Sequence, residues 1–71
     1  MARPRSLSRR LRLARQELGL SVAEVAKSIG VSSVAVYYWE HGQARPRERN
    51  LEALCRVLKL PADEATTLTG R

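Results

Sequence analysis

Hydrophobic residues recur at the spacing of a helix along most of the chain, and no segment alternates in the manner of a β-strand. The first repeat places on one helical face Leu7, Leu11, Ala14 and Leu18. Gly19 is expected to end this helix, because glycine is favoured just past a helix C-terminus. A second repeat follows Pro46 and predicts another helix, whose apolar face consists of Leu51, Leu54, Cys55 and Leu58.

A last short helix is predicted after Pro61. Asp63 and Glu64 would lie in its first turn, where acidic side chains complement the helix dipole. The whole pattern therefore predicts an all-α fold of about five short helices.

The central part of the chain predicts two of these helices and the turn between them. Ser21 and Glu24 have the spacing of a capping box at the start of a helix. Gly30 permits the positive φ of a sharp turn, and Ser32 caps a second helix that Gly42 closes. Helices this short are unstable alone, so we expect them to be docked on each other and on the rest of the chain.

The apolar side chains of this helix pair predict an interior face made of Val25, Ala26, Ile29, Val31, Val36 and Trp39. Ala26 is small at the point where the two helices must approach closely. With Gly30, these positions resemble the helix-turn-helix of the lambdoid phage repressor and Cro family, which includes the Xre-like domains. The resemblance extends over about residues 7–68. It implies a compact bundle at residues 7–71 that binds DNA, preceded by a basic arm at residues 1–6.

The resemblance also implies one ion pair. Arg15 and Glu40 match positions that form a partly buried pair between the first helix and the recognition helix of that family. Neither residue indicates this by itself, and the alternative is that each is a solvated surface charge. The family spacing favours the pair, in a structural role.

Composition restricts the classes of function. A chain of 71 residues forms one small domain, and its single cysteine excludes an internal disulfide. No metal site, cofactor site or paired catalytic group is predicted, so we do not expect an enzyme. No apolar run reaches the roughly 20 residues of a membrane span, and the segment MARPRS is not followed by the apolar region of a signal peptide. The cytoplasm is the expected compartment.

The net charge of +6 indicates a polyanionic partner, and the arginines gather in two groups. One group occupies the first quarter of the chain, and the other follows the second central helix. From these groups and the cap of that helix, the predicted phosphate contacts are Arg10, Arg12, Ser32, Arg45 and Arg47. Arg47 is also compatible with entry into a minor groove, and each arginine is compatible with a solvated charge.

The recognition helix is predicted at Ser33 to His41. Successive residues of a helix are rotated by about 100° around its axis. This rotation places Val36 and Trp39 on the inner side and leaves the opposite side chains to face a major groove. The predicted base contacts are Ser33, Val34, Tyr37 and Tyr38. An exposed Val34 is suited to a thymine methyl group, and the alternative is an ordinary surface valine. His41 is expected to cap the helix C-terminus.

Three positions depart from the family pattern. Tyr37 and Tyr38 replace the short polar residues or glutamine that are more usual there. For Tyr38 we expect DNA contact, whereas Tyr37 is equally compatible with DNA contact and with packing as a partly buried residue. Val22 stands where the family often has a glutamine that binds a phosphate, so only helix N-terminal amides are left for that contact.

These observations predict a sequence-specific regulator of transcription, similar to phage Cro repressors, that occupies a palindromic operator on double-stranded DNA as a homodimer. The family often dimerises through the end of the domain, but the residues there, Glu64 to Thr67, are not strongly apolar. A dimer that is weak without DNA is therefore expected. Alternative functions are the antitoxin of a toxin–antitoxin pair, with a toxin as partner, and the controller of a restriction–modification system.

Overall fold

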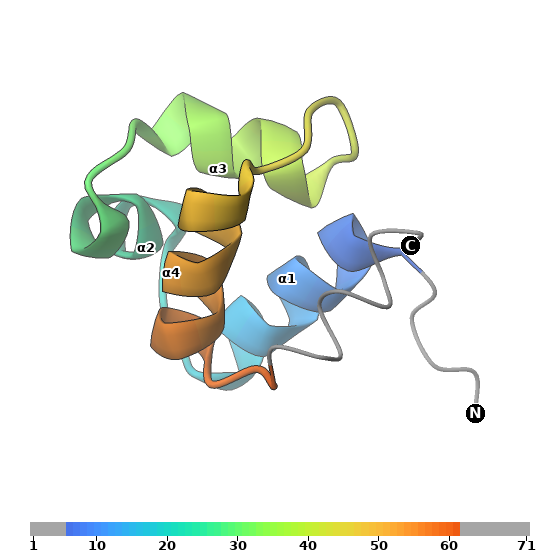
Figure 1. Cartoon of the computed structure of the whole chain (residues 1–71). Coiled ribbons are helices and arrows are strands. Elements are labelled where there is room, and N and C mark those ends of the chain that lie inside the picture. The colour runs from blue at the N-terminus through green and yellow to red at the C-terminus, as the bar shows by residue number, and fades with distance from the viewer. Residues whose placement is uncertain (1–5, 62–71) are drawn as a thin grey trace.

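The computed structural model describes residues 6–61, and this part of the chain folds into four α-helices without a β-strand (Figure 1). The helices are α1 (Leu7–Glu17), α2 (Val22–Ile29), α3 (Ser33–Glu40) and α4 (Glu48–Leu58). The all-α prediction is therefore confirmed, with four helices in place of about five. The helix predicted after Pro61 lies outside the described residues, as do most of the predicted arm and the segment from Glu64 to Thr67.

Helix α1 begins at a side-chain cap and ends one residue before the prediction. Ser6, which the prediction placed in the arm, accepts a hydrogen bond from the Arg9 N–H at 3.3 Å. Glu17 is the last helical residue, and Leu18 is the C-cap with 39% of its surface exposed. Leu18, which the repeat placed on one helical face with three residues that are buried, is itself exposed, because the helix ends before it and Gly19 turns the chain at a φ of 70°.

Helices α2 and α3 have the predicted caps and turn. The Ser21 side chain accepts from the Glu24 N–H at 3.0 Å, and the Glu24 carboxylate accepts from the Ser21 N–H at 2.7 Å. Gly30 ends α2 at a φ of 79°, in the left-handed region that a side chain would strain. Ser32 then caps α3 by accepting from the Ala35 N–H at 3.1 Å. Interactions between residues three positions apart thus determine both helix starts, and Gly30 determines the turn between the helices.

One apolar core joins the four helices. Its most completely buried side chains are Leu11, Val25, Val36 and Leu54, one from each helix. Ala26 and Trp39 are buried in the same cluster, while Ile29 and Val31 pack against its edge. Cys55 is also buried there, as expected for a small apolar side chain. The core covers the inner side of α3, so its outer side is left facing solvent (Figure 1).

A loop of residues 41–47 connects α3 to α4 along one edge of the molecule. Gly42 in this loop lies beside α1, since a Cβ built on it would be 3.7 Å from the Ser8 Oγ. Arg47 is the N-cap of α4 and makes no capping hydrogen bond with its side chain. The start of this loop therefore lies next to the N-terminal turn of α1.

Candidate nucleic-acid interface

The outer face of α3 is exposed and largely apolar. Val34 is 57% exposed, Tyr37 49% and Tyr38 44%, while Val36 and Trp39 on the opposite side are 1% and 7% exposed. Ser33 is exposed at the start of the same face. This division follows from the helical period, which separates residues 34, 37 and 38 from residues 36 and 39. The structure thus places all the predicted base-contacting side chains on one solvent-facing surface.

The N-terminal end of α3 differs from that of α2 in charge. The first turn of α3 contains no acidic residue, whereas Glu24 lies in the first turn of α2 and forms its capping box. The N-terminal dipole of α3 is therefore not offset by a carboxylate in its own first turn, which favours an approaching anion. Ser32, a predicted phosphate contact, is exposed at this end.

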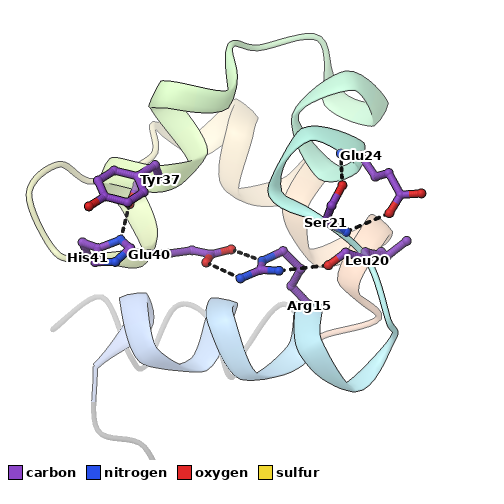
Figure 2. Close-up of polar contacts among 7 residues, drawn as sticks. All are labelled: Arg15, Leu20, Ser21, Glu24, Tyr37, Glu40 and His41. Atoms are coloured by element: carbon purple, nitrogen blue, oxygen red, sulfur yellow. Dashed lines mark hydrogen bonds and ion pairs between the residues drawn. The ribbon is translucent and has the colours of Figure 1, made fainter.

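His41 forms the other end of α3. Its Nδ1 lies 2.8 Å from the main-chain oxygen of Tyr37, and its ring stacks on the Tyr37 ring with centroids 4.0 Å apart (Figure 2). The expected capping role of His41 is therefore present in the structure. The stacking was not expected from the sequence, although the i, i+4 spacing of two aromatic rings on one helix was a signal for it.

Arg15 and Glu40 lie against each other beneath this face (Figure 2). The Arg15 Nε donates to Glu40 Oε2 at 2.7 Å, and its Nη2 donates to Oε1 at 3.0 Å. The Arg15 Nη1 also donates to the main-chain oxygen of Leu20 at 2.9 Å, a contact that the sequence did not suggest. One guanidinium therefore connects α1, the segment before α2, and α3.

Burial makes this ion pair structurally important. The side chains of Arg15 and Glu40 are 14% and 3% exposed. The hydrogen bond to Glu40 raises the pKa of Arg15 from its already high usual value, against the lowering effect of burial. Arg15 therefore stays charged at every physiological pH, and the pair fixes the angle of α3 on α1 by two parallel hydrogen bonds.

The predicted phosphate-contacting arginines come from α1 and the loop after α3. Arg10 and Arg12 are half-buried on α1, and Arg45 and Arg47 are exposed in the loop. Arg10 and Arg45 also interact with other groups of the chain. The proximity of Ser8 to Gly42 brings α1 and the loop together at one edge of the α3 face. Arginines of both predicted groups therefore lie on two elements that approach each other at Ser8 and Gly42.

Among residues 6–61, no three His, Cys, Asp or Glu side chains are grouped so as to hold a metal ion. In the same part of the chain, no helix has the length and apolar character needed to cross a membrane.

Comparison with known proteins identifies the family. Residues 6–68 match a family model described as a helix-turn-helix domain. The chain belongs to this helix-turn-helix family. It is 35% identical over 57 residues to repressor protein C2 of Salmonella phage P22, and this match covers 80% of the chain and 26% of that protein. It is also 35% identical over 54 residues to the helix-turn-helix transcriptional regulator DicA of Escherichia coli K12, covering 76% of the chain and 40% of DicA. The chain thus spans less than half the length of either relative.

Solved structures share the fold of this helix-turn-helix domain. A crystal structure of the P22 c2 repressor in complex with synthetic operator 9T superposes with a TM-score of 0.81 at 33% identity, covering 84% of this chain and 91% of that one. The solution structure of the DNA-binding domain of the same repressor gives a TM-score of 0.82 at 32% identity, covering 93% and 86%. The resemblance to lambdoid repressors that the sequence pattern indicated is confirmed by these matches.

Proposed function

We propose that this domain binds double-stranded DNA as a sequence-specific regulator of transcription, with α3 as the recognition helix in the major groove. The observation that supports this most is the exposed outer face of α3, held at a fixed angle by the Arg15–Glu40 pair. The fold supports it further, because the similar P22 repressor structure contains an operator duplex. A helix presented in this way has the dimensions that a major groove admits.

Specific contacts follow from the order of side chains along α3. Ser33 and Val34 lie in its N-terminal turn, the part that enters most deeply, and Tyr37 and Tyr38 lie one turn later. Val34 would cover a thymine methyl group, which removes apolar surface of both partners from water. The tyrosine rings can contact base edges while their hydroxyls reach phosphates. This face therefore favours recognition by apolar contact.

Phosphate contacts would hold the domain in register on the duplex. The proposed contacts are the start of α3 and the arginines of α1 and of the loop after α3: Ser32, Arg10, Arg12, Arg45 and Arg47. Such contacts supply affinity that depends on salt and is largely independent of sequence. The base contacts of α3 would then supply the sequence preference.

We further propose that the protein acts as a Cro-like repressor on a palindromic operator as a homodimer. A single recognition helix reads few base pairs, whereas two helices roughly 34–36 Å apart read half-sites one helical turn apart. The relatives are a phage repressor and a transcriptional regulator, so we do not favour the antitoxin or restriction–modification alternatives.

The direct test is selection of bound duplexes from a random DNA pool at near-physiological salt, followed by sequencing. We expect enrichment of a palindrome with half-sites one helical turn apart. The variant Tyr38→Ala, selected in parallel, should change the enriched bases and leave the spacing of the half-sites unchanged. Binding that depends on salt but enriches no sequence would contradict sequence-specific recognition by α3.

A further inference from the structure

The side chain of His41 holds Tyr37 at two points. Its Nδ1 donates to the Tyr37 main-chain oxygen at 2.8 Å, since a carbonyl oxygen can only accept. The imidazole also stacks on the Tyr37 ring, with centroids 4.0 Å apart and planes inclined by 28° (Figure 2). The main-chain N–H of His41 donates to the same Tyr37 oxygen at 3.1 Å. One residue therefore contacts both the backbone and the ring of Tyr37.

The Tyr37 ring also has a neighbour in Tyr38. The two tyrosine rings have centroids 6.1 Å apart and are inclined by 57°, within the range of favourable tilted aromatic pairs. Tyr37 and Tyr38 are nevertheless 49% and 44% exposed, and His41 is exposed as well. The Tyr37 ring thus pairs with two other rings at the surface, on the face of α3 that the proposed function assigns to DNA.

We infer that His41 is a positioning residue for base recognition. It holds the Tyr37 ring in the orientation that this ring presents to the major groove, and it does so without contacting a base. An exposed side chain that becomes ordered only when DNA binds loses conformational entropy, and this loss reduces the affinity. A ring that is already held in one orientation avoids this cost and fits fewer of the incorrect bases. His41 therefore contributes to both affinity and discrimination through Tyr37. This inference rests on the proposed function.

The positioning itself can be tested in the free protein. Three-bond Hα–Hβ couplings measured by NMR report whether the χ1 angle of Tyr37 occupies one rotamer or several. We expect a single rotamer in the wild type and averaged couplings in His41→Ala. The variant His41→Phe retains a ring for stacking and should retain the single rotamer, and the exposed neighbour Gln43→Ala serves as the control. Averaged couplings in the wild type, or unchanged couplings in His41→Ala, would overturn the inference.

The consequence for DNA can be tested by a double-mutant cycle on the duplex that the wild type selects. His41→Ala should weaken binding about 3- to 10-fold, the cost of ordering one side chain, with no change in salt dependence. In a Tyr37→Ala background the same substitution should have no further effect. Equal losses in the two backgrounds would overturn the inference, because His41 would then act independently of Tyr37. His41→Phe should recover most of the affinity.

Two controls separate this inference from the proposed function. Thermal unfolding of each variant sets a temperature at which all are folded, since His41→Ala also removes a capping hydrogen bond. A wild type without sequence preference would contradict the proposed function, and the coupling measurement would still decide whether His41 positions Tyr37. A wild type that selects an operator and shows an additive cycle would contradict only the inference.

Discussion

At the residue scale, Val34 is the exposed apolar side chain for which a contact with DNA is most expected. It is 57% exposed on a helix whose inner apolar residues are almost completely buried. A single exposed valine is common on protein surfaces, but this one has Tyr37 and Tyr38 one turn away on the same face. The three side chains form an apolar strip, and an apolar strip in a major groove can contact the thymine methyl group.

Val34→Ala should reduce the preference for one thymine by roughly 1–3 kcal/mol, the scale of a single base contact, and leave nonspecific affinity nearly unchanged. Replacing that thymine by uracil removes the same methyl group from the DNA side. The two changes together should cost little more than either alone, as measured by equilibrium binding. Leu13→Ala, which truncates an exposed leucine on α1, is the matched control and should not alter binding. A loss that is uniform over all sequences would contradict the methyl contact.

At the scale of elements, the Arg15–Glu40 pair decides how α3 is held. The packing of α3 on α1 and α2 is apolar and not directional, whereas the guanidinium fork of Arg15 meets the carboxylate at 2.7 and 3.0 Å. A third hydrogen bond from the same fork, to the Leu20 oxygen, connects the start of α2. The pair therefore links the two halves of the helix-turn-helix to the first helix.

Arg15→Ala should destabilise the fold by roughly 3 kcal/mol, because it leaves the Glu40 carboxylate buried without its counter-charge. In a domain of this size, such a loss lowers the Tm by roughly 12–24 °C, which thermal unfolding followed by circular dichroism measures. The double variant with Arg15→Met and Glu40→Leu should recover most of the stability, since it removes both charges. An unchanged Tm in Arg15→Ala would show that the pair does not stabilise the fold.

At the scale of the whole molecule, the arginines of the described residues are divided among α1, the loop of residues 41–47 and α4. The net charge is +6, and the start of the loop passes close to α1, where a Cβ built on Gly42 would be 3.7 Å from the Ser8 Oγ. Arg56 lies on the last turn of α4, nine residues and roughly 13 Å of helix from Arg47. These two exposed arginines therefore provide a comparison of identical charges at opposite ends of one helix.

Arg47→Ala should weaken binding to specific and nonspecific duplexes alike and lower the slope of log affinity against log salt by about one unit. Arg56→Ala removes the same charge away from the proposed surface and should change the slope much less. Binding titrations over a range of salt concentrations measure the slope for each of the two variants. If the two variants have the same slope, Arg47 does not contact a phosphate. A loss confined to A·T-rich flanks would instead indicate entry into the minor groove.

Local interactions explain why much of the fold was predictable. The caps of α2 and α3 involve residues three positions apart, and the turn requires the positive φ of Gly30. The buried faces follow from helical periodicity, so Val25, Val36 and Leu54 were expected in the core. Leu18 was the exception, because a periodic pattern does not record at which residue a helix ends.

The sequence by itself thus determined the four described helices, the caps of α2 and α3, the turn between them and the division of α3 into a buried and an exposed face. These depend on neighbouring residues and on the helical period. Tertiary structure decided the geometry of the Arg15 fork, whose partner is 25 residues away, and its hydrogen bond to the Leu20 oxygen. It also decided the stacking of His41 on Tyr37, because side-chain rotamers depend on their surroundings in space. The spacing of residues limits which groups can meet, and packing selects the contacts that form.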